Sequence, residues 1–290
     1  MPRVAVVTDT TQYLPSDVIE RHGISLVSLY VNWDGRTDRE SDLADYDAFY
    51  DHLRTAAELP STSQPSVGDF LEVYEPLVER GDAILSIHLS GAISGTVRAA
   101  EQARDVLVER GMPAENMVVI DSRTGCAGHG LMAVAAANAV KDGGDLDAAV
   151  AAARALREDF QVIVMVDTLE YLRRGGRIGA ARAWIGATLK VKPLLTIDGE
   201  MQPVERVRTA GRAFERLVAH LEQRRAEGCD AFAIQHIQAP AEAERLAERG
   251  RELFGNDPVL LSEIGPVIGT HTGPGVLGVA GLRTSLLGPV

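Results

Sequence analysis

The sequence predicts an α/β protein of two domains. Short apolar runs alternate with amphipathic segments of roughly 10 to 15 residues, and glycine, proline or polar clusters separate them. This alternation is typical of β-α-β units, in which helices cover both faces of a mostly parallel sheet. A chain of 290 residues that is 46% apolar can build two cores of ordinary size. We therefore expect an N-terminal domain over residues 1–160 and a C-terminal domain over residues 161–290.

Four apolar runs in the first half are predicted to be buried strands. Each ends in polar or turn-forming residues, and stretches with helical spacing lie between or after them. Parallel strands need such crossover helices, so a mostly parallel sheet flanked by helices is expected. The strands are predicted at 4–7, 24–31, 83–89 and 117–120, and the helices at 15–22, 46–53, 66–77, 96–110, 131–140 and 146–156.

The second half predicts a mixed sheet with helices. Its clearest signal is a β-hairpin of strands 194–197 and 202–207, joined at Asp198 and Gly199, because Asp-Gly readily adopts the positive φ angles of a two-residue turn. The tail from Gly265 is predicted to be a glycine- and proline-rich loop that precedes a strand of small residues. Further strands are predicted at 162–166, 231–237, 259–264 and 276–282, and helices at 168–174, 210–225 and 240–254.

Composition restricts the possible functions. The 29 basic and 41 acidic residues give a net charge of −12, which argues against attraction to nucleic acid or anionic lipid through the overall field. A signal peptide and an apolar stretch of membrane-spanning length are both lacking, so a cytoplasmic protein without stable membrane insertion is expected. Cys126 and Cys229 lie far apart and match no metal spacing, so neither a disulfide framework nor a metal site is predicted.

The stretch 83–100 predicts an anion site. A buried strand is followed by two Ser-Gly pairs, at Ser90 and Ser94, and then by a helix that opens at Thr96. This order directs backbone N–H groups and hydroxyls toward one point. The alternative is a structural turn in which Ser94 only caps the helix. Nucleotide phosphate is a weaker prediction than carboxylate, because neither a Walker A motif nor a kinase glycine loop is present.

Three other segments carry candidate binding residues. The hydroxyl-rich loop 60–66 is a second possible anion contact, and His271 stands between two threonines in a stretch, 265–275, rich in glycine and proline. Arg173, Arg174 and Arg177 are the most basic spot in an acidic chain. They predict either a docking surface for an acidic or phosphate-bearing partner or simple capping of a helix C-terminus.

Two further motifs receive structural interpretations. Residues 128–133 match G-x-G-x-x-A, but they do not follow a strand directly, so we interpret the glycines as helix-packing residues. Cys126 and His129 could form a nucleophile and its base. No third group that would orient the histidine is evident, so a small apolar cysteine in a turn is the preferred interpretation.

Together these motifs resemble the DegV family, whose characterised members are bacterial fatty-acid-binding proteins that present a bound fatty acid to a separate fatty acid kinase. The resemblance extends in order along the whole chain. The matching stretches are 7–10 (V-T-D-T), 62–66 (T-S-Q-P-S), 90–96, 119–122 (V-I-D-S), 168–178, 192–195 (K-P-L-L), 206–209 (R-V-R-T) and 265–275.

The resemblance implies two α/β domains with the lipid between them and its tail in an apolar tunnel. It implies that Thr62, Ser94 and His271 bind the carboxylate, and that the protein is a carrier in phospholipid synthesis rather than an enzyme. The only expected ligand is a long-chain fatty acid, without cofactor or metal. Supporting site residues would be Ser63, Ser90, Gly95, Thr96 and Thr270, and residues at the rim or kinase contact would be Arg173, Arg174, Arg177, Arg206 and Arg208.

The chain departs from the family pattern at 91–93 and at Val97, which bears on the fit of the acyl chain more than on the headgroup. Two alternatives to the carrier stay open. One is an enzyme acting on a small carboxylated or phosphorylated metabolite, with Ser94 as nucleophile or His271 as general acid or base. The other is a regulatory or scaffold domain with a vestigial pocket. The sequence leaves the preferred acyl chain and the oligomeric state open.

Overall fold

The computed structural model describes residues 2–43, 45–56, 58–184 and 191–290. These residues divide into two compact units. The first consists of the described residues of Met1–Tyr30, Ser63–Asp159 and Ser285–Val290, and the second of those of Val31–Thr62 and Phe160–Thr284. Neither unit is continuous in sequence, unlike the ranges 1–160 and 161–290 that the sequence predicts.

Long-range hydrogen bonds explain why the units are discontinuous. Within the second unit, the Tyr50 hydroxyl donates to the carbonyl oxygen of Ile264 at 2.7 Å. Within the first, Asn138 Nδ2 donates to the carbonyl oxygen of Leu287 at 2.9 Å. Contacts between residues so far apart leave no signal in local periodicity, which is the physical reason for the difference.

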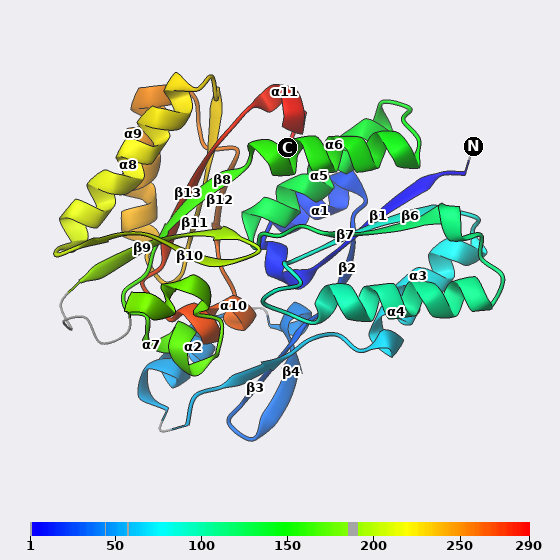
Figure 1. The fold of residues 1–290 in the computed structure, drawn as a ribbon, viewed down its shortest axis with the longest axis horizontal. Helices are drawn as coiled ribbons and strands as arrows, with labels where there is room; N and C mark the ends of the chain where they lie inside the picture. Colours follow the sequence, from blue (N-terminus) through cyan, green and yellow to red (C-terminus); the bar gives the residue numbers. More distant parts are fainter. Residues whose placement is uncertain (1, 44, 57, 185–190) are drawn as a thin grey trace. The chain divides into compact units, whose positions relative to one another are not determined.

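The first unit contains a parallel four-stranded sheet, in the order β2-β1-β6-β7 (Figure 1). The parallel sheet expected in the first half is therefore confirmed. The strands are β1 (Val4–Asp9), β2 (Ser25–Val27), β6 (Ala83–His88) and β7 (Met117–Asp121).

Helices cover both faces of this sheet. Helices α3 and α4 contribute to one apolar cluster with Val7 and Ile84, while α5 and α6 pack together on the other face (Figure 1). Ser66 begins α3 with a capping box, since its hydroxyl accepts from Asp69 N at 3.1 Å. The helices are η1 (Thr10–Gln12), α1 (Ser16–His22), α3 (Val67–Glu79), α4 (Thr96–Glu109), η3 (Ala114–Asn116), α5 (Ala127–Lys141) and α6 (Leu146–Asp159).

The predicted strand at 24–31 is wrong in its extent. The run divides into β2 and β3 (Tyr30–Trp33), which belong to different sheets. Between them the N–H of Leu29 donates to Thr10 Oγ1 at 3.2 Å, so the chain leaves the first sheet there. β3 instead joins β4 (Arg36–Arg39) and β5 (Ser61–Ser63) in a three-stranded sheet of order β4-β3-β5.

The second unit contains a mixed six-stranded sheet, in the order β10-β9-β8-β13-β11-β12. β11 and β12 pair in parallel, whereas β10–β9, β9–β8, β8–β13 and β13–β11 are antiparallel. The predicted hairpin is present, with Gly199 at a φ of +76° in its turn. The strands are β8 (Gln161–Met165), β9 (Lys192–Asp198), β10 (Glu200–Val207), β11 (Ala231–His236), β12 (Leu260–Glu263) and β13 (Leu277–Leu282).

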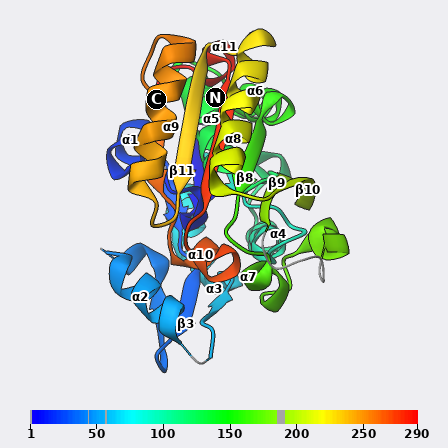
Figure 2. The ribbon, with the colours of Figure 1, turned by 90° about the vertical axis from the view of Figure 1, so that its left-hand side faces the viewer.

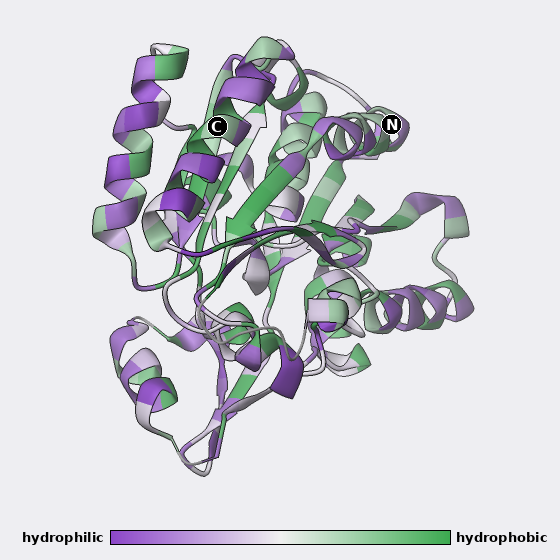
Figure 3. Ribbon diagram, turned by 60° about the vertical axis from the view of Figure 1, so that its left-hand side comes forward, coloured by the Kyte–Doolittle hydropathy of each residue, from purple (hydrophilic) through white to green (hydrophobic). Residues whose placement is uncertain are grey.

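Helices α8 (Ala210–Ala226) and α9 (Pro240–Phe254) lie side by side over this sheet (Figure 2). Their ribbons alternate between polar and apolar colours, whereas several strands of the sheet are largely apolar (Figure 3). Such a pattern is expected for helices with one buried face. The remaining helices are η2 (Glu40–Asp42), α2 (Asp47–Thr55), α7 (Glu170–Arg174), η4 (Gly179–Trp184), α10 (Pro266–Thr272) and α11 (Thr284–Leu287).

The sequence predicts a loop over the glycine-rich stretch 265–275. In the structure most of this stretch is helix α10 instead. Pro266 opens α10, where its fixed φ suits the first helical position, and Gly273, at a φ of +78°, ends it. No helix within the described ranges is both long and apolar enough to span a bilayer.

Candidate ligand-binding site

A pocket of about 410 Å³ lies within the second unit. Its lining comes from β5 and the residues before it, from the end of α7 and from α10. Two guanidinium groups and no carboxylate are among the described side chains that line it. The lining residues are Leu59, Pro60, Ser61, Thr62, Arg174, Gly175, Arg177, Thr270 and His271. A cavity with this charge favours an anionic ligand.

The pocket joins two residues that the sequence singles out separately. Thr62 Oγ1 and His271 Nε2 are 2.8 Å apart, although 209 positions separate them in the chain. Thr62 lies on β5, and His271 lies in the last turn of the short helix α10. The hydrogen bond fixes the imidazole edge relative to the hydroxyl.

Side chains from the segment 31–62 hold α10 in place. The Glu40 carboxylate accepts the N–H of Val267 at 2.8 Å, and the Tyr50 hydroxyl donates to Ile264 just before the helix. Both Glu40 and Tyr50 are buried. A Cβ on Gly269 would overlap the Tyr50 hydroxyl, so glycine allows this close packing. Segment 31–62 thus supplies Thr62 and also supports the helix that carries its partner.

Gly175 makes room for the His271 ring. A Cβ at this position would overlap His271 Nδ1, so a larger residue would displace the imidazole. The sequence predicts that Gly175 and Gly176 end the helix before them, and α7 does end at Arg174. The structure adds a second reason for glycine at position 175.

His271 is a neutral imidazole at neutral pH. Burial, together with the nearby charge of Arg177, lowers the pKa of His271 to about 4. Its Nδ1 is buried and has no hydrogen-bond partner among the described residues. If the Thr62 hydroxyl donates to Nε2, the proton of the neutral ring lies on Nδ1. If Nε2–H donates to Thr62 Oγ1 instead, the Thr62 hydroxyl proton is not used within the pair. In the second case the Thr62 hydroxyl is the donor left for a ligand oxygen, whereas in the first the remaining proton sits on the buried Nδ1 beside Gly175.

The loop of residues 90–95, which we call the Ser90–Gly95 loop, lies in the first unit between β6 and α4. Ser90 is fully buried, and its N–H donates to the carbonyl oxygen of Thr124 at 2.8 Å. Ser94 is partly exposed, and its Oγ lies 2.8 Å from Thr96 Oγ1 and accepts the Thr96 N–H at 3.3 Å. The N-cap residue of α4 is Gly95 rather than Ser94, and Ser94 instead accepts the N–H of the first helical residue from one position further out.

The supporting residues predicted for the site lie in both units. Ser63 is exposed at the end of β5, and a Cβ on Gly95 would overlap the side-chain amide of Gln64, so this part of the T-S-Q-P-S segment packs on the Ser90–Gly95 loop. Thr270 lines the pocket, but its hydroxyl donates to the carbonyl oxygen of Pro266 at 2.8 Å. Its role there is to stabilise α10.

The five predicted rim arginines occupy different surroundings. Arg173 and Arg174 both contact Glu170, whose pKa their hydrogen bonds lower to about 2. Arg174 and Arg177 line the pocket. The guanidinium of Arg206 lies 5.2 Å from the centre of the Trp184 ring, and Arg208 is exposed.

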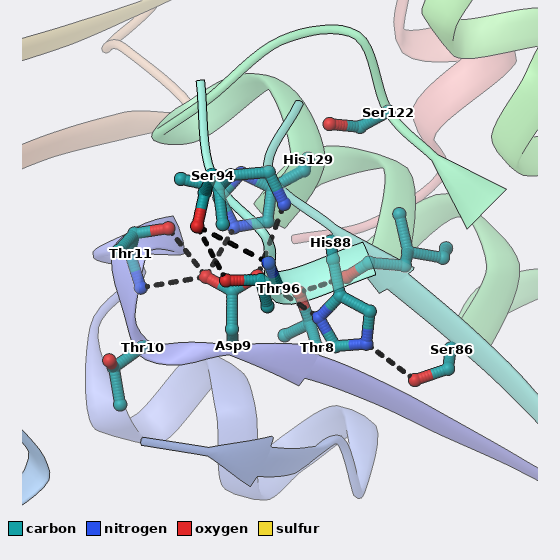
Figure 4. A network of polar contacts seen from close by, with 12 residues as sticks. Thr8, Asp9, Thr10, Thr11, Ser86, His88, Ser94, Thr96, Ser122 and His129 are labelled. Carbon is teal, nitrogen blue, oxygen red and sulfur yellow. Dashed lines mark hydrogen bonds and ion pairs between the residues drawn. The ribbon is translucent and has the colours of Figure 1, made fainter. Parts of the chain in front are cut away.

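Sequence reasoning missed Asp9, which is fully buried at the end of β1. Asp9 Oδ1 lies 3.3 Å from His129 Nε2 (Figure 4). This carboxylate is a group that could orient His129, which no residue near Cys126 and His129 in the sequence provides. Because His129 is fully buried, it does not face a substrate in solvent. Ser86 and His88, at alternate positions of an apolar strand, were the signal that could have revealed a buried polar network.

The fold and the pocket describe a two-unit α/β protein with an anion-favouring site. A model of the family described as "Uncharacterised protein, DegV family" matches residues 3–284. The chain is 38% identical over 279 residues to a DegV domain-containing protein of Clostridium acetobutylicum, covering 96% of both. It is 41% identical over 279 residues to one of Streptomyces coelicolor, covering 95% of this chain and 97% of the relative. The protein belongs to the DegV family.

Two solved structures are similar over nearly the whole chain. A DegV family protein from Thermus thermophilus, described by its fatty acid binding, has a TM-score of 0.86 at 35% identity and covers 97% of this chain and 99% of its own. DegV from Bacillus subtilis, described as a fatty acid binding protein, has a TM-score of 0.87 at 34% identity, with 98% and 100% covered. The two-unit α/β fold is thus shared with these proteins.

Proposed function

We propose that this protein is a carrier that binds a long-chain fatty acid and presents its carboxylate to a fatty acid kinase. Thr62, Ser94 and His271 are the proposed carboxylate ligands. The observation that carries the proposal is the Thr62–His271 pair in a pocket with two guanidinium groups. The fatty acid binding of the T. thermophilus and B. subtilis relatives supports the ligand class.

The two ends of the ligand have different tasks. Burying about 15 methylenes contributes on the order of 12 kcal/mol before the costs of association, at ~0.8 kcal/mol per methylene. Hydrogen bonds to the carboxylate contribute ~1.5 to 3 kcal/mol each, most of which replaces lost hydration. The tail therefore supplies affinity, and the headgroup contacts determine which end is presented to the kinase.

A neutral His271 suits this role. The Thr62–His271 pair offers one donor to the ligand without bringing a second full charge into the pocket, and Arg177 supplies a positive field nearby. Ser94 bonds to Thr96, and His271 bonds to Thr62. Ser94, the nucleophile of the enzyme alternative, is thus bonded to a hydroxyl rather than to a base, which favours a binding role for it.

The kinase contact is proposed for the exposed arginines. Arg173, Arg174 and Arg177 border the end of α7, and Arg206 and Arg208 belong to β10 and the residues after it. In a chain of net charge −12 these cations are the proposed contacts for an acidic partner. We place the carrier in the cytoplasm, in fatty acid activation for phospholipid synthesis.

Mass spectrometry of the purified protein tests the proposal. Solvent extraction should release a fatty acid in about equimolar amount, and the delipidated protein should take up added palmitate or oleate. Ser94→Ala and His271→Ala should weaken uptake, whereas Asn138→Ala, which alters a contact with the C-terminal segment, should not. If the protein contains no fatty acid and takes up none, the proposal is wrong.

A further inference from the structure

Five buried side chains that the proposed function does not use form a continuous polar chain in the first unit. The Tyr74 hydroxyl lies 2.7 Å from Ser86 Oγ, and Ser86 Oγ lies 2.7 Å from His88 Nε2. His88 Nδ1 is 3.0 Å from Asp9 Oδ2, and Asp9 Oδ1 is 3.3 Å from His129 Nε2 (Figure 4). All five residues are 0% exposed. Polar groups are expensive to bury, so a chain of this length requires an explanation.

The chain connects four separate elements. Tyr74 comes from α3, Ser86 and His88 occupy alternate positions on β6, Asp9 ends β1, and His129 lies in the first turn of α5. Alternate residues of a strand share one face, which places Ser86 and His88 together. The network therefore ties helices from both faces of the sheet to the carboxyl ends of its two central strands.

The protons of the chain have one consistent arrangement. Burial raises the pKa of the Tyr74 phenol well above its usual range, so its hydroxyl is protonated and donates to Ser86. Ser86 then donates to His88 Nε2, and His88 Nδ1–H donates to Asp9 as a neutral imidazole. The reverse order would leave the Tyr74 proton without an acceptor among the contacts of the described residues.

The Asp9 carboxylate depends on its two histidine neighbours. Burial alone would raise the pKa of Asp9, but His129 and His88 hold it well below its usual range. An isolated buried carboxylate is very unfavourable, so these two contacts are what make a buried Asp9 anion tolerable.

The carboxylate also holds the start of the Ser90–Gly95 loop. Asp9 Oδ2 accepts the backbone N–H of Leu89, the residue directly before Ser90, at 3.1 Å. Asp9 Oδ1 accepts the N–H and the hydroxyl of Thr11, at 3.1 Å and 2.5 Å. A second bond joins the same strands, because Thr8 Oγ1 donates to the carbonyl oxygen of Ile87 at 2.7 Å.

We propose that Asp9, as a buried anion in contact with His88 and His129, is a positioning residue for the Ser90–Gly95 loop. It fixes the N–H of Leu89 and, through the loop, the place of Ser94. The effect of Asp9 on ligand binding rests on the proposed function, in which Ser94 contacts the carboxylate. The effect of Asp9 on the position of the loop is independent of that function.

The first test uses Asp9→Asn with Asn138→Ala as a matched control. Asn138 is a buried side chain on the same helix as His129, and it bonds to Leu287 and Pro289 instead of the network. At a temperature where both variants are folded, Asp9→Asn should weaken palmitate binding about tenfold, the equivalent of one lost charge-assisted hydrogen bond. Asn138→Ala should lower the melting temperature without this loss.

Measurements without lipid separate this proposal from the proposed function. Amide exchange of Leu89 should accelerate in Asp9→Asn and not in Asn138→Ala. If the wild type binds no fatty acid, the proposed function fails, while the Leu89 exchange rates still decide the role of Asp9.

A second pair of variants covers the case in which Asp9→Asn does not fold. His129→Gln should accelerate Leu89 exchange in the same way, and Ser86→Ala, which keeps the Asp9–His129 pair, should do so less. Unchanged Leu89 exchange and unchanged binding in whichever of Asp9→Asn or His129→Gln folds contradict the proposal.

Discussion

The Thr62–His271 pair and the Ser90–Gly95 loop are both proposed to meet the ligand carboxylate, but the protein holds them differently. Thr62 and His271 are fixed by a hydrogen bond to a neutral imidazole and by close packing at Gly175 and Gly269. The Ser90–Gly95 loop begins at an N–H bound to a buried anion. The proposed binding residues of the second unit thus rest on steric fit, whereas those of the first unit rest on hydrogen bonds to a buried carboxylate.

The difference predicts different sensitivities. Close packing fails when volume is added, because neighbouring groups in a dense interior cannot move far. A buried ion pair fails when one charge is removed or neutralised, since the other is left uncompensated. Volume changes should therefore affect the Thr62–His271 pair most, and charge or pH changes should affect the Ser90–Gly95 loop most.

The largest effect is expected for Gly175→Ala. The added methyl group would overlap His271 Nδ1 and displace the ring, which should weaken fatty acid binding roughly 10- to 100-fold, as for an overpacking cost of about 1 to 3 kcal/mol. Titration calorimetry with palmitate measures this. Gly211→Ala is the control, because a Cβ there meets nothing within 4 Å and its effect on binding should be nil. Equal affinities of the two variants would refute the packing role of Gly175.

Acid should destabilise the first unit through Asp9. The folded state lowers the pKa of Asp9, so the unfolded chain binds more protons as the pH falls below about 4, and the free energy of unfolding falls with it. The loss should be roughly 2 kcal/mol between pH 5 and 2. Urea unfolding at several pH values measures it, with native-state hydrogen exchange separating the units.

Asp9→Asn should be less stable than the wild type at pH 7 but should lose less stability on acidification. Asn138→Ala should keep the wild-type dependence of unfolding free energy on pH, because Asn138 bonds to Leu287 and the contacts of the Asp9 carboxylate stay intact. An Asp9→Asn variant with the wild-type slope would show that Asp9 is not the source of acid sensitivity.

A smaller effect is expected for Tyr50→Phe. The change removes the donor to Ile264 and leaves a carbonyl oxygen before α10 without that partner, at a cost of about 1 kcal/mol in stability. Palmitate affinity should fall roughly two- to fivefold, because α10 carries His271. Tyr74→Phe is the counterpart in the first unit, where Ser86 can still donate to His88. Loss of affinity in Tyr74→Phe greater than in Tyr50→Phe would contradict the comparison.

The smallest effect concerns His271 between pH 6 and 8. With a pKa of about 4, this imidazole is neutral throughout that range and its contribution to binding should not change. An NMR titration of the His271 ring protons should show a midpoint near 4. Titration near the ordinary value of 6.5 would mean that burial and Arg177 do not control its charge.

The sequence predicted those parts of the fold that depend on local patterns. The strands β1, β6 and β7 are short, mostly apolar runs, and the β9–β10 hairpin has its Asp-Gly turn. Helix α10 was missed because its short sequence contains glycine and threonine, which are weak helix formers, and its support comes from Glu40 and Tyr50. A helix that depends on distant contacts leaves little trace in its own residues.

The candidate site was predictable to a similar extent. Thr62 and His271 were identified from separate motifs, and the structure brings them within hydrogen-bond distance. Asp9 was missed because an aspartate between threonines at the end of a strand resembles an ordinary turn, and its burial depends on residues 79 and more positions away. The assignment of Ser94 to the ligand carboxylate stays a prediction.

The most direct test of the proposed function is ¹³C NMR of palmitate labelled at its carboxyl carbon and bound to the protein. We expect one resonance from an ionised carboxylate at pH 7, which moves in Thr62→Val and His271→Gln but not in Asn138→Ala. A bound carboxyl resonance that is identical in the wild type and in all three variants would contradict the assignment of the headgroup to Thr62 and His271.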